Sequence, residues 1–241
     1  MKTSNMLIIA AIIVSLGMIT TYNFSLKAAY EAGDYKNRFN ESEFREMKNI
    51  ETLNVADANL LAIVVEPGQK EGVWIRKRIK DRLVLNQVGN TLTIGLTDEA
   101  RKMGRATRYD DIVLFTNKLN KLSTVAYWPA GNKREDVNIY GGEVSLKGIK
   151  SPDLDIRMAA STSVTMNKMM LKTLRAVVGD EKGGAALNLD QDNHIEFAEF
   201  EIPGASKLSL SNPKIVKTRY NLSDKASVTL NGAALQVIKN Q

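Results

Sequence analysis

A four-residue phrase that recurs five times in the second half of the chain constrains the fold more than any other feature. Each copy reads apolar, small polar, apolar, turn former, and the copies begin at Val144, Val164, Leu187, Leu208 and Val228. Successive copies start 20, 23, 21 and 20 residues apart, which is the period of a solenoid coil. The sequence therefore predicts an all-β fold in which coils of β-strand stack on one another.

Alternation within the phrase assigns a face to each side chain. The two apolar residues of a copy point to one side of the strand and the small polar residue points to the other. Stacking the coils about 4.8 Å apart then produces an inward apolar column and an outward polar column, the latter made of Ser145, Thr165, Asn188, Ser209 and Thr229. Apolar residues also recur seven or eight positions after a phrase, as at Leu171 and Ile195, which predicts three inward-facing strands in each coil.

The amino terminus carries an apolar run, residues 6–19, that is broken only by Ser15 and Gly17. Its length fits a short membrane anchor or the core of a signal peptide. No small-x-small cleavage site follows closely, which favours an uncleaved anchor. Long domains cross the membrane largely regardless of flanking charge. We therefore expect a protein held to the membrane by this helix, with its domain outside the cytoplasm, in the periplasm or on the cell surface.

Changes in pattern divide the chain into four parts. Residues 1–24 are the signal-anchor or signal peptide, and the polar residues 25–49 are a juxtamembrane spacer. Short strand signals separated by turns, such as the turn at Gly89, predict a hairpin-rich β cap over residues 50–110. Residues 111–241 are the β-solenoid, with a strand expected at 137–139 and the extra length of one coil assigned to the Gly183–Gly184 pair.

Three features are the basis of a family resemblance. They are the strand pairs of residues 50–94, which end in GNTLTI, the strand IVLF at 112–115, which leads into LNKL at 119–122, and the 20-residue repeats. Together they resemble the auto-transporter adhesin, head GIN domain family of bacterial envelope proteins, over residues 50 to 241. The chain departs from that family after Leu122, where STVA replaces the glycine-rich steps. The resemblance implies a right-handed parallel β-helix on an exported protein, and it offers no catalytic motif to carry over.

Several classes of chemistry are excluded or disfavoured by composition. The chain has no cysteine, which removes disulfides and cysteine-ligated metals, and His194 is the only histidine, which removes multi-histidine metal sites. No Gly-x-Ser-x-Gly motif is present, so we expect His194 to be an ordinary surface residue. The net charge is +6, but the basic runs at 76–82 and 101–108 lack any recognition-helix or zinc-finger pattern. We expect solvated loops there and no nucleic-acid partner.

Two functional hypotheses remain open. A dense acidic cluster contains Asp190, Asp192, Glu196 and Glu199, and paired carboxylates could cleave envelope polysaccharide or hold Ca²⁺. Lysines interleave with the cluster, and no calcium-repeat pattern appears. We therefore favour a non-catalytic envelope protein, a binding, adhesion or structural scaffold without cofactor or metal. Its outward polar column is the tentative binding face for a glycan or an envelope protein, although β-propensity alone would also produce such a column.

Overall fold

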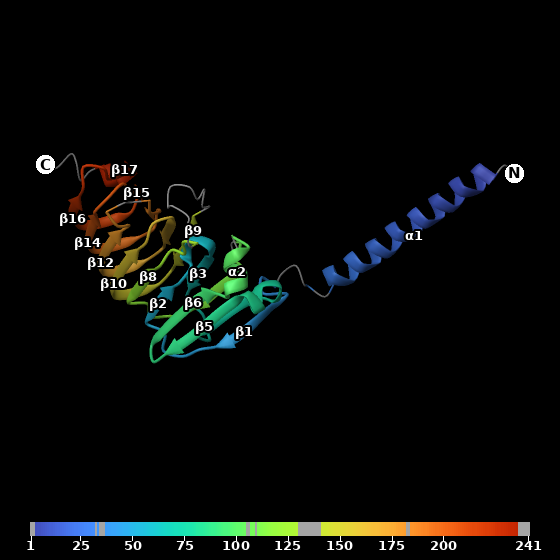
Figure 1. Cartoon of the computed structure of the whole chain (residues 1–241), viewed down its shortest axis with the longest axis horizontal. Coiled ribbons are helices and arrows are strands. Elements are labelled where there is room, and N and C mark those ends of the chain that lie inside the picture. The colour runs from blue at the N-terminus through green and yellow to red at the C-terminus, as the bar shows by residue number, and fades with distance from the viewer. Residues whose placement is uncertain are drawn as a thin grey trace. The chain divides into compact units, whose positions relative to one another are not determined.

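The computed structural model describes residues 3–31, 33, 37–104, 107–108, 110–129, 141–181 and 184–235. The chain divides into two compact units, Met1–Ser42 and Glu43–Gln241 (Figure 1). The strand expected at residues 137–139, and Gly183 of the glycine pair, lie outside the described residues.

The first unit contains a single long helix, α1 (Thr3–Glu31), so the helix continues through residues 25–31 of the expected spacer. Its apolar side chains are exposed, among them Leu7 at 72% and Met18 at 69%, and the helix has a mean hydropathy of 2.0 in its most apolar stretch. The Ser15 hydroxyl donates to the Ala11 carbonyl at 2.8 Å, so this polar group is satisfied inside the helix. By length and composition α1 can cross a membrane.

The second unit consists of two β-sheets. Sheet A has nine strands, in the spatial order β1 (Ser42–Glu46), β4 (Gly72–Arg76), β7 (Ile112–Phe115), β3 (Ala62–Glu66), β9 (Gly142–Lys147), β11 (Thr162–Asn167), β13 (Ala186–Leu189), β15 (Lys207–Ser211) and β17 (Ser227–Asn231). Sheet B has eight, in the order β16 (Lys214–Leu222), β14 (His194–Ile202), β12 (Met170–Val178), β10 (Lys150–Met158), β8 (Lys121–Thr124), β2 (Thr52–Val55), β6 (Thr91–Leu96) and β5 (Leu83–Val88). Short helical segments connect some of them: η2 (Ala58–Leu60), η3 (Lys77–Arg82), α2 (Asp98–Lys102) and η4 (Gly232–Leu235).

From β9 onward the chain alternates between the sheets, one strand in sheet A and one in sheet B, and every neighbouring pair is parallel. The register pairs Val144 with Val164, then Leu187, Leu208 and Val228 in turn. The inward column expected from the phrase is therefore present, and the predicted β-solenoid is confirmed. Antiparallel pairs occur at the N-terminal end, between β5 and β6 and between β4 and β7.

Each coil has two strands where three were expected, because the third side is a bend within the long sheet-B strand. In β12 the buried residues are Leu171, Leu174, Ala176 and Val178. The step of three after Leu171 breaks the two-residue alternation of a strand. At the same place the register omits Lys172, since Leu171 pairs with Ser151 and Thr173 with Asp153. The strand therefore changes face there and turns a corner of the coil.

In the repeats, a left-handed backbone residue follows each of the sheet-A strands β9, β11, β13, β15 and β17. These residues are Gly148, Lys168, Asp192, Asn212 and Gly232, with φ between 54° and 68°. After β13, Asn193 is fully buried, donating from Nδ2 to the carbonyls of Met166 and Asp190 and accepting from the Met169 amide. The turn formers that end the phrases therefore lie one or two residues before these left-handed residues.

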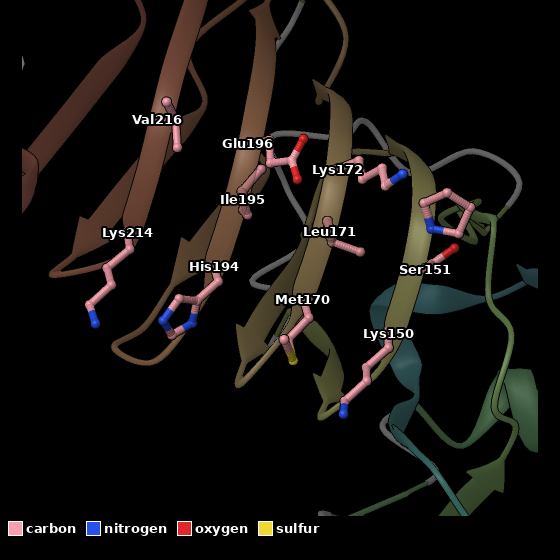
Figure 2. A pocket seen from close by; sticks show the side chains of 11 residues that line it. Lys150, Ser151, Met170, Leu171, Lys172, His194, Ile195, Glu196, Lys214 and Val216 are labelled. Atoms are coloured by element: carbon pink, nitrogen blue, oxygen red, sulfur yellow. The ribbon is translucent and has the colours of Figure 1, made fainter.

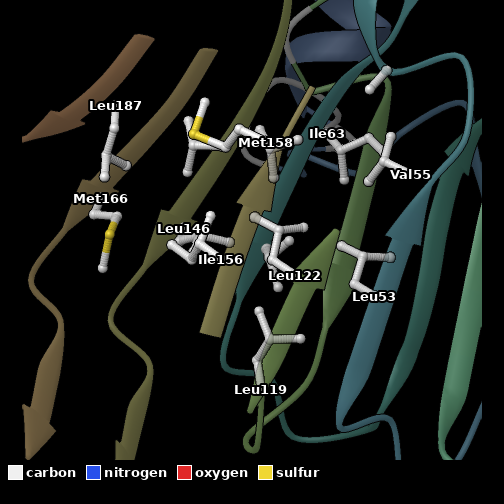
Figure 3. Packing of buried hydrophobic residues seen from close by; sticks show 14 of the residues in the cluster. Leu53, Val55, Ile63, Leu119, Leu122, Leu146, Ile156, Met158, Met166 and Leu187 are labelled. Atoms are coloured by element: carbon white, nitrogen blue, oxygen red, sulfur yellow. The ribbon is translucent and has the colours of Figure 1, made fainter. Parts of the chain in front are cut away.

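The core lies between the two sheets and is almost entirely aliphatic (Figure 3). Leu53, Leu122 and Ile156 pair across β2, β8 and β10 and are at most 1% exposed. Leu146 and Met166 occupy the facing sheet. Burying each such side chain is worth about 1.5–3 kcal/mol, so the regular columns are the main source of stability.

Candidate binding surfaces

The outward polar column runs along sheet A in continuous register, as the phrase predicts. Ser145 pairs with Thr165, Thr165 with Asn188, Asn188 with Ser209, and Ser209 with Thr229. Ser145 is only 4% exposed, whereas Thr165, Asn188 and Ser209 are partly buried and Thr229 is exposed. The accessible part of the tentative binding face is therefore the four residues from Thr165 to Thr229.

The polar column does not continue into the N-terminal coils. Beyond Ser145 the same position is occupied by Val64 and then Val113, each 1% exposed. Within the column, the Asn188 side-chain amide donates to Ser163 Oγ at 3.2 Å, so part of its capacity for hydrogen bonds is already used. The face carries hydroxyls and an amide but no charge, which suits a neutral polar ligand better than an ion.

A second surface, a shallow trough of about 680 Å³, crosses the outer side of sheet B at the corner of the long strands (Figure 2). One rim is formed by the first residues of four strands, Lys150, Met170, His194 and Lys214, which pair in register. The opposite rim is formed by the residues at the bend, Pro152, Lys172, Glu196 and Val216. Ser151, Leu171 and Ile195 lie between the rims.

The trough combines apolar and cationic groups. Leu171 and Ile195 are 5% and 2% exposed, while Met170 and Val216 on the rims are 50% and 76% exposed. Sequence reasoning missed this surface, because the strand bend that produces it is invisible in the repeat. The signal that could have found it is the apolar character of Met170 and Val216 at positions that point outward.

The acidic cluster does not converge on one site. Asp190 and Asp192 lie at the corner before β14, where Asp190 Oδ2 accepts from the Asn167 amide at 3.1 Å. Glu196 is on the rim of the trough, and Glu199 forms an ion pair with Arg219 at 3.4 Å further along β14. Across the described residues, no three His, Asp or Glu side chains group in a way that could hold a metal ion. The geometry therefore gives the polysaccharide-cleaving alternative no support.

A row of alternating charge explains several of these carboxylates instead. On the outer face of sheet B the register aligns Lys121, Asp155, Arg175, Glu199 and Arg219. Arg175 lies 3.6 Å from Asp155, and Arg219 lies 3.4 Å from Glu199. Opposite charges at adjacent positions support the parallel register, so these residues help to hold the coils in place.

The two basic runs also have structural partners. Arg101 donates from Nε to the 5%-exposed Asp57 at 2.9 Å and from Nη1 to Asp98 at 2.7 Å, and it lies over the Tyr127 ring at 5.6 Å. The hydrogen bond from Arg101 to Asp57 raises the pKa of the arginine above its usual value. Arg78 pairs with the buried Asp111. Thr97 caps α2, accepting from the Ala100 amide at 3.3 Å.

Comparison with known proteins does not assign the chain to a family. The chain matches no protein-family model and no curated protein. A solved structure from Bacteroides fragilis NCTC 9343, described as a "putative adhesin", has 11% sequence identity and a TM-score of 0.46, and the match covers 78% of this chain and 95% of the other. A structure from Parabacteroides distasonis ATCC 8503, described as a "Putative lipid binding protein", has 18% identity and a TM-score of 0.40, with 80% and 95% covered. At these TM-scores neither structure says what this chain binds.

Proposed function

We propose that this protein is a membrane-anchored scaffold of the cell envelope that binds a partner outside the cytoplasm and does no catalysis. The observation that carries the proposal is the register of sheet A, which sets Thr165, Asn188, Ser209 and Thr229 in one uncharged polar row. Steps of about 4.8 Å give an extended ligand, such as a glycan or a peptide of an envelope protein, the same contact repeatedly. The acidic cluster, by contrast, is divided between a corner of the coil, the rim of the trough and the row of alternating charge.

The anchor and the domain limits belong to the same proposal. The exposed apolar surface of α1 supports its insertion in the bilayer, and the strand patterns at residues 50–94 and 112–122 support membership of the head GIN domain family. We take residues 1–24 as the anchor, 25–49 as the spacer, 50–110 as the cap and 111–241 as the solenoid, and we expect the cap and the solenoid to fold together as one domain. Phe44 of β1 packs on Trp74 with ring centroids 5.0 Å apart, so the end of the spacer contacts the cap.

Location is tested by adding protease to spheroplasts. We expect the domain to be degraded, and the intact protein to stay in the membrane fraction until detergent is added. A shortened soluble form would mean that α1 is a cleaved signal peptide. Intact protein in the soluble cytoplasmic fraction would contradict the proposal.

Binding is tested with a glycan array and a polysaccharide-hydrolysis screen on the same preparation. Thr165→Arg and Ser209→Arg add bulk and charge to the polar row, so we expect them to weaken glycan binding. Glu196→Gln and Glu199→Gln, on sheet B, should leave it unchanged. Turnover that is lost in either Gln variant would establish the enzyme instead and overturn the scaffold.

A further inference from the structure

We infer that the trough on sheet B binds a single anionic amphiphile, with its charged headgroup between Lys150 and Lys172 and its acyl chain running across the strands toward Val216. This site is separate from the polar row on sheet A and extends the proposed function to a second class of ligand. It is assigned from the lining of the trough alone (Figure 2).

The apolar part of the trough contrasts with the charged row on the same face of the sheet. Elsewhere on the outer face of sheet B, the row from Lys121 to Arg219 is charged at every step. In the trough, the outward-pointing Met170 and Val216 are exposed to 50% and 76%, and they border the recessed side chains of Leu171 and Ile195. Covering such a strip of apolar surface releases water, and this is the usual source of affinity in a ligand site of this volume.

The charges around the trough select an anion. Lys150, Lys172 and Lys214 are exposed on its rims, against one carboxylate, Glu196. None of the three lysines forms an ion pair with a carboxylate in the described ranges. Lys150 and Lys172 come from the adjacent strands β10 and β12 and lie on opposite rims, so they flank one end of the trough. An anionic headgroup there is attracted from both sides.

The shape of the trough favours a single acyl chain over the flat surface of a bilayer. Leu171 and Ile195, the most recessed apolar groups, lie between two raised rims of side chains. A flat lipid surface would meet the rims and leave these groups uncovered, whereas a single acyl chain can lie between the rims. The trough spans four strands, which is about 14 Å at the usual strand separation and long enough for a medium-length chain.

The test uses the full chain in nanodiscs of phosphatidylcholine and a dodecanoate that carries a photoactivatable diazirine. After illumination, mass spectrometry locates the covalent adducts. We expect adducts on residues of β12, β14 and β16, and we expect excess dodecanoate to suppress them more strongly than dodecanol, which has the same chain without the charge. Lys150→Glu and Lys172→Glu should each weaken labelling about tenfold, since a favourable charge becomes a repulsive one.

Matched variants show whether labelling depends on the trough itself or on the charge and apolar area of the surface in general. Lys217→Glu makes the same charge change on β16 outside the trough, and it should leave labelling unchanged. Met170→Glu should abolish labelling, while Val125→Glu, at a similarly exposed position (58%) elsewhere, should not. Circular dichroism of each variant checks that the fold is kept, and a variant that loses it is replaced by the Gln substitution at the same position.

Three outcomes would overturn the inference. They are adducts confined to α1, equal suppression by dodecanoate and dodecanol, and labelling that requires anionic phospholipid in the disc, which would indicate contact with the bilayer surface. None of these outcomes bears on glycan binding, because the Arg variants of Thr165 and Ser209 lie on the other sheet.

Discussion

Leu210 and Ser209 are neighbours in β15 whose side chains meet opposite environments. Leu210 is 1% exposed in the core, and Ser209 faces outward in the polar row. Leu210→Asp should lower the free energy of unfolding by several kcal/mol, because an unpaired carboxylate enters the core. Ser209→Asp should change it by less than about 1 kcal/mol. Circular dichroism melting of the two variants checks this, and equal loss in both would contradict the assigned faces.

Asp57 and Arg101 form an ion pair in which the carboxylate is buried. Asp57 is 5% exposed, has a left-handed backbone (φ 58°) and also accepts from the Leu96 amide at 2.9 Å. Arg101→Met removes the cation, so the free energy of unfolding should fall by about 1–3 kcal/mol. Adding Asp57→Asn should recover part of that loss, because the neutral amide tolerates burial better and asparagine accepts the backbone conformation.

A double-mutant cycle in denaturant measures this pair. Asp57→Asn alone is the control, since Arg101 can still pair with Asp98 in that variant. Additive effects of the two substitutions would show that the contact contributes no coupling energy. The sequence indicated neither partner, because 44 residues separate them and only the folded chain brings them together.

Among the residues at the corners of the coils, Lys168 is the least suited to the left-handed backbone conformation that it adopts. The equivalent residues are Gly148, Asp192, Asn212 and Gly232, all types that tolerate a left-handed conformation, while Lys168 has φ 54°. Lys168→Gly should therefore raise the free energy of unfolding by up to about 1 kcal/mol. The matched control, Lys207→Gly in the regularly paired strand β15, should lower it by about 0.5–1 kcal/mol. Stabilisation by both, or by neither, would contradict this.

The alternating charge row on sheet B is a property of neighbouring strands. Glu199 lies between Arg175 and Arg219, whereas Glu201, two residues along β14, lies between Val177 and Asn221. Glu199→Lys would place three cations at adjacent positions and should cost about 1 kcal/mol. Glu201→Lys makes the same change without like-charged neighbours, and it should be close to neutral. Thermal melts at low and high salt check this, because screening should narrow the difference.

How far the sequence predicts an element depends on whether its signal is local. The phrase predicted the sheet-A strands and the inward column, since alternation and spacing are read directly from the residues. The bend in the sheet-B strand was not predicted, because the break after Leu171 looks in sequence like an ordinary strand end. The third expected strand per coil was in fact the second half of the same strand, and the trough at that bend was therefore missed as well.

At the scale of the whole molecule, the order of the coils in space differs from their order in the chain. In sheet B, β2 lies between β6 and β8, and in sheet A, β3 lies between β7 and β9. After β1 at the edge of sheet A, the chain enters the middle of the stack at β2 and β3 and runs outward to β4 and β5. It then returns through β6 and β7 and continues on the other side of β2 and β3 at β8 and β9. Repeats reveal which segments stack but not which segment is inserted between two others, so the sequence could not show this.

The order of the strands in the two sheets predicts which fragments of the second unit can fold on their own. A fragment of residues 42–241 keeps both sheets complete, and it should be soluble without detergent and melt cooperatively. A fragment of residues 111–241 contains every copy of the phrase but lacks β2 and β3. It would expose Leu122 of β8 and Val144 of β9, which pair with Leu53 and Ile63 in the intact protein. Because a solenoid coil is stabilised only by its neighbours, this fragment should aggregate.

Circular dichroism and size-exclusion chromatography of the two fragments test this. If the shorter one is a folded monomer with a comparable melting temperature, the repeats form a domain of their own and residue 111 marks its boundary.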